Sequence, residues 1–465
     1  MPESKKRNTF TGSIGFVLAA AGSAVGLGNI WRFPYLAARD GGGLFIVVYL
    51  ILAVTFGFTL LITEISIGRK TRQSPLTAYG ELKKNWKSLG VLACIIPMLI
   101  LPYYCVIGGW VLKYLFAFIS GAGFQTASDG YFSLFITDIT SPVIMAVIFL
   151  AITMLVVICG VQKGIEKFSK IMMPLLIILI IVILIFSLNI SHADEAGNVR
   201  TGMQGLKVLI VPDLSTVTLP TFLSTVMDAM GQLFYSLSVA MGIMIAYGSY
   251  MPDEVSIEKS VSEIEIFDTG VAFLAGMMII PAVYVFMGRE GMEASGPGLM
   301  FVSLPKVFEQ MGNMGNIVGC LFFALVLFAA TTSSVSILEA VVSSFMDKFG
   351  MSRNKATITE GLIALVLELL VCFGYNILYF EYMLPNGATA QILDIMDYIS
   401  NNLMMPIVSI ATYILIGWVL KPQVVVDEVT KNGNKFARGK LFTVMLKFIA
   451  PLMLLVLLLK AVNIL

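Results

Sequence analysis

The sequence predicts an all-α membrane protein of eleven transmembrane helices, arranged as a 5+5 inverted-topology repeat plus an eleventh helix. Of its 465 residues, 58% are hydrophobic and only 13% are charged, and the mean hydropathy is +0.90. A soluble domain is about half apolar and a quarter charged. The apolar residues fall into eleven long runs, and two of these runs are interrupted at matching places in the two halves of the chain.

Each apolar run is about long enough to cross the hydrocarbon core of a bilayer as a helix. The predicted spans are 11–37, 43–68, 89–120, 142–160, 168–190, 221–250, 264–287, 316–346, 357–376, 390–420 and 441–464. No soluble stretch is long enough to fold alone. We therefore predict a single transmembrane domain over 1–465, with repeat one at about 11–190, repeat two at about 221–420 and the extra helix at about 441–464.

Lys and Arg residues set the expected orientation. With the N-terminus inside, the cytoplasmic segments carry about four times as many of them as the opposite side, which holds Arg39, Arg200, Lys207, Arg289 and Lys306. Cytoplasmic loops of membrane proteins show this excess. We predict a multi-pass protein of the cell (inner) membrane whose N-terminus is cytoplasmic and whose C-terminus lies outside.

Composition also excludes some classes of function. The formal net charge of +1 argues against a nucleic-acid surface, which would need a basic patch. His192 is the one histidine, and it falls in a polar connection, so histidine-based or metal-based catalysis has almost nothing to work with. We expect no enzymatic activity.

The first interrupted run contains the stretch 21–34, which carries three glycines, an asparagine, an arginine and a proline. Glycine weakens a helix and proline cannot continue one normally, and the freed backbone groups need partners other than lipid. A second interrupted run, at 232–242, follows about 210 residues later. Two interrupted helices in corresponding positions indicate a binding site at the midplane. The alternative is that these small residues only permit close helix packing.

An unwound helix offers carbonyl oxygens to a cation and an N-terminal dipole to a carboxylate. Around the first break, Gly22, Ala24 and Val25 offer carbonyls, and Asn29 offers a side-chain oxygen. Ser236 adds a hydroxyl from the second break. Such oxygen ligands suit a hard cation such as Na⁺.

The eighth predicted span holds four consecutive hydroxyl residues, 331–334, directly after two alanines. One interpretation is that each hydroxyl bonds back to its own helix. The other is a cation site in which a local kink also frees the carbonyl of Ala329. Ionisable residues inside spans are costly and indicate function unless they form structural ion pairs; the deep candidates are Arg32, Glu64, Asp268, Glu339, Glu368 and Asp397.

Three motifs, at 22–35, 40–43 and 64–69, closely resemble the neurotransmitter:sodium symporter family of sodium- and chloride-dependent transporters. They are most similar to its bacterial amino-acid transporters of the leucine-transporter fold, which is built from inverted-topology repeats. The resemblance runs from Arg7 to the eleventh span. It implies a sodium-coupled amino-acid symporter that works by alternating access, with discontinuous helices 1 and 6.

The resemblance also implies two sodium sites. The first would use Ala24, Asn29, Ser236 and Asp268 together with the substrate carboxylate. The second would use the carbonyls of Gly22, Val25 and Ala329 and the hydroxyls of Thr332 and Ser333.

The same resemblance implies a substrate site and two gates. The substrate carboxylate would lie on the Gly26 and Gly28 amides with the Tyr104 hydroxyl as a further donor, and Tyr104 and Tyr235 would form an aromatic lid. The full substrate-binding set is Ala24, Gly26, Leu27, Gly28, Ile100, Tyr104, Tyr235, Ser236, Ser238, Met241, Ser333 and Ile337. The outer gate would be Arg32 with Asp397, and the inner gate Arg7 with Asp347, supported by Tyr250.

Two departures from the family pattern refine these expectations. Asp268 is an acid where chloride-dependent relatives have a neutral residue, so we predict that no chloride is needed. Met241 stands where the leucine-type relative has Phe, and a flexible thioether suits a large hydrophobic or aromatic amino acid, tryptophan or tyrosine first and leucine-like next. The predicted partners are the amino acid and the lipid bilayer, with a monomer sufficient for transport and the oligomeric state open.

Three other functions remain as alternatives. Broken helices and hydroxyl rings also build ion channels. A non-transporting amino-acid sensor could use the same fold. An intramembrane enzyme is the weakest alternative, since the sequence holds no HExxH metal pair.

Overall fold

The computed structural model describes residues 9–193, 197–212, 217–293 and 295–464, and most of them lie in helices. The helices are α1 (Ser13–Ala24), α2 (Phe33–Arg39), α3 (Gly43–Leu52), α4 (Phe58–Thr71), α5 (Pro75–Leu82), α6 (Lys87–Ile119), α7 (Tyr131–Thr137), α8 (Ser141–Ile158), α9 (Lys167–Asn189), α10 (Gly202–Ile210), α11 (Leu219–Ser236), α12 (Ile243–Ser249), α13 (Ile257–Met287), α14 (Gly296–Gly298), α15 (Leu304–Gln310), α16 (Asn313–Phe349), α17 (Arg353–Phe373), α18 (Ile392–Asp397), α19 (Met405–Ile414), α20 (Gln423–Val429), α21 (Gly439–Val444) and α22 (Ala450–Ala461).

Two antiparallel hairpins complete the fold. They pair β1 (Ser191–Ala193) with β2 (Val199–Thr201), and β3 (Tyr382–Met383) with β4 (Thr389–Ala390). The connection predicted at 191–220 is therefore not simply a loop, because it holds the first hairpin and α10. Thr201 caps α10, since its side chain accepts a hydrogen bond from the Gln204 amide while the Gln204 side chain bonds back to the Thr201 amide.

Nine helical stretches in the described ranges are long and apolar enough to cross a membrane, and a bent pair of helices makes a tenth. They overlap ten of the eleven predicted spans, which agrees with a polytopic helical membrane protein. The predicted span 221–250 is the exception. It divides into α11 and α12, and the residues between them are not helical.

The first predicted break lies between α1 and α2. After α1 ends at Ala24, Val25 takes an extended conformation, and a π-helical turn at Gly28–Arg32 leads into α2. The two halves meet at an angle of 53°. Pro34 lies inside the helix that this turn and α2 form together, and it has no backbone N–H to donate, so the helix lacks one hydrogen bond there.

The second predicted break separates α11 from α12. Ser238 and Ala240 have φ values of 53° and 65°, and Gly242 has 76°. Left-handed backbone is strained for residues with a Cβ and is held only where the surroundings require it. One such restraint is the carboxylate of Glu64, whose Oε1 accepts a hydrogen bond from the Ala240 amide at 2.5 Å. A buried acid on α4 therefore fixes the shape of the second break.

Two glycines allow α4 and α12 to touch backbone to backbone. A Cβ at Gly68 would lie 2.0 Å from the carbonyl oxygen of Ile245, and one at Gly248 would lie 2.4 Å from that of Ile65. No larger side chain fits at either place. Because the two backbones touch, α4 fixes the position of α12. It thereby fixes where the helix begins again after the second break.

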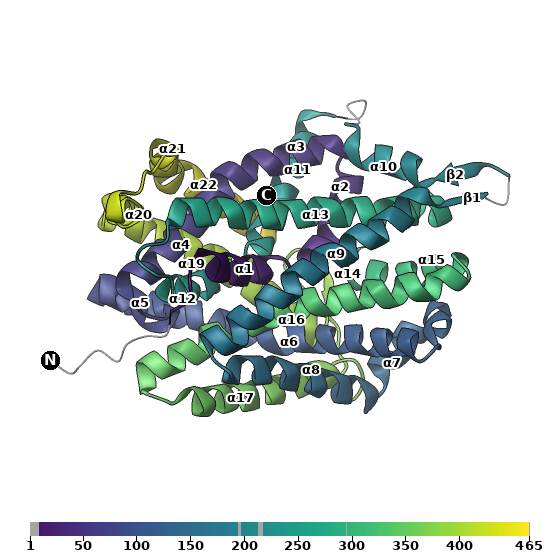
Figure 1. The fold of residues 1–465 in the computed structure, drawn as a ribbon, viewed down its shortest axis with the longest axis horizontal. Coiled ribbons are helices and arrows are strands. Elements are labelled where there is room, and N and C mark those ends of the chain that lie inside the picture. The colour runs from purple at the N-terminus through teal and green to yellow at the C-terminus, as the bar shows by residue number, and fades with distance from the viewer. Residues whose placement is uncertain (1–8, 194–196, 213–216, 294, 465) are drawn as a thin grey trace.

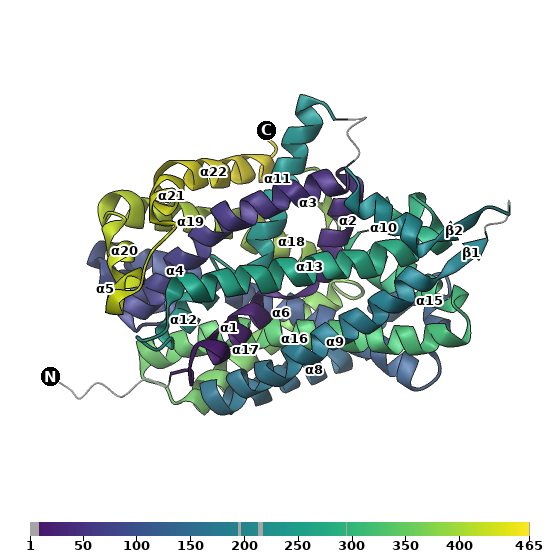
Figure 2. The same ribbon diagram turned by 45° about the horizontal axis from the view of Figure 1, so that its top comes forward.

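The broken helices lie at the centre of the molecule. Figure 1 shows α1 in the middle, and Figure 2 shows α3, α4 and α13 on one side of it and α8, α16 and α17 on the other. α1 contacts α13, α16 and α9, while α6, α8, α16 and α17 pack against one another. Both breaks are therefore enclosed by whole helices and kept away from lipid, as unpaired backbone in a membrane requires.

Candidate functional site

One cavity lies where the two breaks meet α6 and α16. Its wall includes the breaks themselves, an aromatic pair and several small or apolar side chains. The lining residues are Ser23, Ala24, Gly26, Leu27, Gly28, Asn29, Ile100, Tyr104, Tyr235, Ser236, Ser238, Met241, Ser333 and Ile337. The structure thus brings all twelve residues of the predicted substrate-binding set around one space, and it adds Ser23 and Asn29.

The hydroxyl of Tyr104 in this cavity is available to a ligand. Tyr104 is buried, and its hydroxyl has no hydrogen-bond partner among the residues that the structure describes. A Cβ built on Gly26 would lie 3.2 Å from this hydroxyl and 2.8 Å from the Ser333 Oγ. Gly26 therefore leaves open the space in front of a free hydrogen-bond donor, which is how a small polar ligand group is bound.

The Gly26 amide is already engaged, since it donates to the Asn29 Oδ1 at 3.0 Å. A bound carboxylate would have to compete for it. Gly28 is shaped by a different neighbour, because a Cβ there would lie 2.9 Å from the Tyr235 ring. Its carbonyl accepts from the Gln232 Nε2 at 3.0 Å. Gln232 is fully buried on α11, and sequence reasoning missed it although a polar amide inside a span is a usable signal.

A buried cluster of oxygen atoms adjoins this cavity. The Asp268 Oδ1, on α13, accepts from the Asn29 Nδ2 at 2.7 Å and from the Ser236 Oγ at 2.6 Å. Asn29 and Asp268 are completely buried, and Ser236 is 3% exposed. Three of the four residues predicted for the first sodium site therefore meet through direct hydrogen bonds, and the fourth, Ala24, lines the same cavity.

Tyr49 belongs to this cluster, and sequence reasoning missed it. Its hydroxyl lies 3.3 Å from the Asp268 Oδ2, and its ring is buried against Phe33 and Phe45. Both carboxylate oxygens of Asp268 are thus held by neutral donors. Among the described residues, the contacts of this carboxylate come from a hydroxyl, an amide and a phenol and from no cationic side chain, so its charge is available to a small cation.

The hydroxyl run on α16 divides between the two interpretations that the sequence left open. Thr331, Thr332 and Ser334 donate to carbonyls of their own helix, as back-bonding hydroxyls do. Ser333 instead donates to the carbonyl of Ser23, across the interface with α1, at 3.0 Å.

The predicted second sodium site is assembled in part. Ser333 lies 3.5 Å from the carbonyl of Val25, and a Cβ on Gly22 would lie 3.4 Å from that of Thr332. The expected kink at Ala329 is wrong, because α16 runs unbroken from Asn313 to Phe349. The Ala329 carbonyl instead accepts from the Thr332 hydroxyl at 3.0 Å.

On the outer side, Arg32 and Asp397 lie near the cavity without touching each other. No ion pair joins them within the described ranges. The Arg32 guanidinium lies 5.8 Å from the centre of the Tyr235 ring, and the Asp397 Oδ1 accepts from the Asn401 Nδ2 at 2.6 Å. Tyr235 lines both the central cavity and a second, outer pocket that Arg32 and Asn401 also line. The Tyr235 ring therefore separates the two spaces.

On the opposite side, Arg7 lies outside the described residues. Its predicted partner Asp347 accepts from the Ser74 amide at 2.7 Å. Tyr250 donates to the Glu339 Oε1 at 2.7 Å, and Glu339 forms an ion pair with Arg353 at 2.6 Å. For Glu339, the structural ion pair that the sequence left as an alternative is therefore present. Arg353, the first residue of α17, was missed as the partner.

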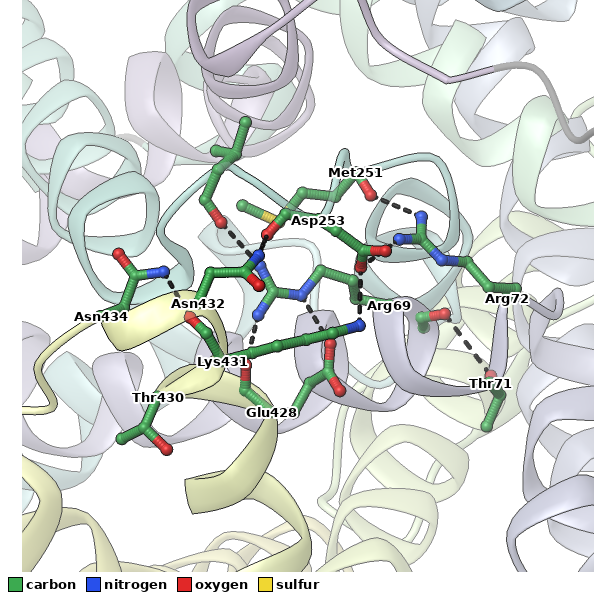
Figure 3. A network of polar contacts seen from close by, with 12 residues as sticks. Arg69, Thr71, Arg72, Met251, Asp253, Glu428, Thr430, Lys431, Asn432 and Asn434 are labelled. Carbon is green, nitrogen blue, oxygen red and sulfur yellow. Dashed lines mark hydrogen bonds and ion pairs between the residues drawn. The ribbon is translucent and has the colours of Figure 1, made fainter.

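A polar network beside this face ties the end of α4 to α20 and to the turn after α12 (Figure 3). Arg69 is 1% exposed, and its Nε donates to the Glu428 Oε1 at 2.7 Å. Asp253 accepts from Arg72 at 2.5 Å and from Lys431 at 3.0 Å. Burial raises the pKa of the Asp253 carboxyl, but the bond from Lys431 and the charges of Arg72 and Lys431 outweigh it and hold the pKa below its ordinary value.

Comparisons with known proteins cover almost the whole chain. The pattern of the Sodium:neurotransmitter symporter family matches residues 7–129 and 132–465. YhdH of Bacillus subtilis, described as an uncharacterized sodium-dependent transporter, is 34% identical over 464 residues, which is 97% of each chain. The sodium- and chloride-dependent GABA transporter 2 of Mus musculus is 24% identical, over 89% of this chain and 73% of the mouse protein. The crystal structure of MhsT in complex with L-phenylalanine matches with a TM-score of 0.83 at 35% identity, over 98% of this chain and 100% of MhsT.

Proposed function

Since the chain belongs to the sodium:neurotransmitter symporter family, we propose that it carries a hydrophobic or aromatic L-amino acid into the cell together with two sodium ions, by alternating access and without chloride. Family membership itself establishes a membrane transporter that uses sodium and takes a small-molecule substrate. One observation carries the finer proposal. The oxygen cluster and the cavity share a wall, because Ala24, Asn29 and Ser236 line the cavity and also form the predicted cation site.

The shared wall explains why amino acid and ion would travel together. A carboxylate bound beside Tyr104 completes the ligand shell of a cation held by Asn29, Ser236 and Asp268. Each partner then binds poorly alone, because the cation lacks a ligand and the carboxylate lacks a counter-charge. Since the Gly26 amide bonds to Asn29, the amides of Leu27 and Gly28 are the better candidates to hold the carboxylate.

The cavity wall supports a hydrophobic substrate. Beyond the polar end, its lining is contributed by Ile100, Met241 and Ile337 with the Tyr104 and Tyr235 rings. Such a lining favours an apolar or aromatic side chain. The MhsT crystal structure holds L-phenylalanine, and we extend that chemistry to this chain, with tryptophan, tyrosine and leucine-like side chains as the candidates.

Chloride independence rests on Asp268. This buried acid places a fixed negative charge beside the cation ligands, with neutral donors on both of its oxygens. We propose that the fixed charge takes the place of a bound chloride. The second sodium ion would lie between α1 and α16, held by the Gly22, Val25 and Ala329 carbonyls and the Thr332 and Ser333 hydroxyls. Thr332 would have to turn from its own helix to contribute.

Transport itself would be a rocking motion. The moving bundle would be the first two spans of each half (α1–α4 and α11–α13), tilting against the other spans of the 5+5 repeat. Tyr235 with Arg32 and Asp397 would close the outer side. Arg7 and Asp347, with the Tyr250–Glu339 bond, would close the cytoplasmic side. The eleven-span count, the single domain, a cytoplasmic N-terminus and a sufficient monomer belong to the same proposal.

The driving force is large enough for strong accumulation. At about −100 mV each sodium ion gains about 2.3 kcal/mol. A roughly tenfold sodium gradient adds about 1.4 kcal/mol per ion. Two ions therefore supply about 7 kcal/mol, which corresponds to roughly 10⁵-fold accumulation of a zwitterion.

Equilibrium binding to the purified protein tests the coupling directly. Labelled L-tryptophan, L-tyrosine, L-phenylalanine and L-leucine are titrated in Na⁺ and, at the same ionic strength, in K⁺. We expect Na⁺ to raise amino-acid affinity at least about tenfold and, by reciprocity, the amino acid to raise Na⁺ affinity by the same factor. Equal affinity in both salts for every amino acid would contradict the proposal.

A further inference from the structure

The segment 423–438, which joins the tenth predicted span to the eleventh, is fastened to the other half of the transporter. It comprises α20 and the turns that follow it as far as Arg438. In the part of the chain that the structure describes, its long-range polar contacts all go to residues 54–69 and 253–265. These residues belong to α3–α4 and to the start of α13 with the turn before it.

The first fastening is the buried Arg69–Glu428 pair (Figure 3). The Arg69 side chain is 0% exposed and that of Glu428 is 7% exposed. Arg69 also donates to the Glu428 main-chain carbonyl and, at 2.6 Å, to the carbonyl of Val255. One guanidinium on α4 thus binds both α20 and the turn before α13. Separating a buried pair leaves an uncompensated charge, so these three elements stay together.

The second fastening is at Asp253. Its carboxylate binds Lys431 at 3.0 Å, and its main-chain carbonyl accepts from the Asn432 side chain at 2.9 Å. Lys431 and Asn432 lie in the turn that comes after α20. The same carboxylate binds Arg72, just after α4. The turn before α13 therefore connects the segment to both parts of the proposed moving bundle.

The third fastening is at the far end of the segment. The Glu258 carboxylate accepts from the backbone amides of Ala437 and Arg438, at 2.9 and 3.0 Å. The Arg438 guanidinium reaches Glu265 at 3.3 Å and lies 3.6 Å from the centre of the Phe58 ring. The segment is thus held at Glu428, at 431–432 and at its far end, by α4, α13 and the turn before α13.

The junction with the tenth span is weaker by contrast. α19 and the π-helical turn after it end at Val419, Lys421 takes left-handed backbone with φ 67°, and Pro422 follows. Lys421 carries a Cβ, and Pro422 donates no backbone hydrogen bond, so the helical path is interrupted there. If the bundle moved and the segment did not, the buried pair and all the other contacts above would break. If the segment moves with the bundle, only this short junction and the entry to α21 need to bend.

We propose that the 423–438 segment moves as part of the rocking bundle, and that Arg69, Asp253 and Glu258 are the positioning residues that attach it. This rests on the proposed alternating-access function. The connection between predicted spans ten and eleven then moves together with the broken helices. The spans that it joins in sequence stay in place.

Pulsed electron spin resonance distances test this, using labels on exposed residues whose side chains form no hydrogen bond or ion pair with any residue that the structure describes. Glu254 reports the position of the bundle, Asn354 on α17 that of the static part, and Lys435 that of the segment. Cys159, which is exposed, is first replaced by Ser, and the three residues are then changed to Cys two at a time. Distances are compared in Na⁺ with amino acid and in K⁺ alone. We expect the 254–354 and 435–354 distances to shift together by more than about 2 Å, the scale of domain rearrangement on binding, while 435–254 stays constant.

A 435–254 distance that shifts while 435–354 stays constant would overturn the proposal, because the segment would then belong to the static part. If 254–354 itself does not change, the rocking motion fails, and the inference falls with it. Glu258→Ala should broaden the 435–254 distribution. Its matched control is Glu263→Ala on the same helix, whose partner is Lys259, and it should leave that distribution unchanged. Equal distributions in the two variants would remove Glu258 from the attachment.

Discussion

Replacing Asn29 with alanine is the most revealing single perturbation of the first sodium site. The Asn29 side chain is fully buried and makes three hydrogen bonds, to the Gly26 amide at 3.0 Å and to Asp268 at 3.2 and 2.7 Å. Alanine would remove one oxygen from the proposed ligand set. It would also leave the Gly26 amide and the Asp268 main-chain carbonyl without these partners.

The expected loss follows from these contacts. A hydrogen bond to a charged group contributes about 1.5–3 kcal/mol, and we use that range for one oxygen ligand of Na⁺. At about 1.4 kcal/mol per tenfold change, the Na⁺ concentration for half-maximal binding should rise about 10- to 100-fold. The free energy of unfolding should also fall, by about 1–3 kcal/mol for each buried group left unpaired.

Thermal unfolding in detergent across a Na⁺ titration, with K⁺ keeping ionic strength constant, separates the two effects. Bound ligand stabilises a protein by RT ln(1 + [L]/Kd), so the Na⁺ concentration at which stabilisation sets in reports affinity and the K⁺ baseline reports intrinsic stability. Asn316→Ala is the control, since this side chain on α16 donates at 3.4 Å to the Phe118 carbonyl, about 25 Å along the helix from Ser333. If stabilisation of Asn29→Ala set in at the same Na⁺ concentration as in the unchanged protein, that result would refute the role of Asn29 as a ligand.

Three further predictions concern the substrate pocket, the buried acid and the polar network. Gly26→Ala places a Cβ 2.8 Å from a hydroxyl of α16 and 3.2 Å from that of Tyr104. Equilibrium binding of labelled amino acid should therefore weaken at least about tenfold, which is the effect of losing one charged hydrogen bond. Binding of unchanged strength would mean that the substrate carboxylate does not lie beside Gly26. Asp268→Ser removes the fixed charge, and uptake should then require chloride, whereas equal uptake in chloride and gluconate would show that the acid does not replace an anion. Arg69→Gln leaves Glu428 buried and unpaired, so the free energy of unfolding should fall by about 3–5 kcal/mol, measured as a lower thermal midpoint; an unchanged midpoint would mean that the pair is not buried.

The breaks in the two helices could be predicted from sequence because their causes are local. Gly26, Gly28 and Pro34 oppose a continuous helix wherever they stand in a span. The second break was predicted from its small residues, but its shape was not. That shape depends on Glu64 of α4, whose carboxylate holds the Ala240 amide from 176 residues away.

The site residues that were missed depend on partners distant in sequence. Tyr49 looks like an ordinary aromatic residue of an apolar run, and only the folded chain brings its hydroxyl, on α3, to Asp268, on α13. Arg353 pairs with Glu339 across the turn between α16 and α17. The sequence around a charged residue at the start of a helix does not indicate which residue it pairs with. The expected kink in α16 was wrong for a related reason, since the hydroxyls that suggested it satisfy the helix carbonyls without bending the helix.

Uptake into proteoliposomes tests whether the protein couples amino-acid transport to sodium. Labelled L-tryptophan, L-tyrosine, L-phenylalanine and L-leucine are supplied outside vesicles that contain K⁺, with either Na⁺ or K⁺ in the outer medium. We expect at least one of them to accumulate above its outside concentration under the inward Na⁺ gradient. Accumulation should disappear when the gradient is dissipated and should persist when gluconate replaces chloride. No accumulation of any amino acid under the gradient, or a single-channel current through the protein, would contradict sodium-coupled transport.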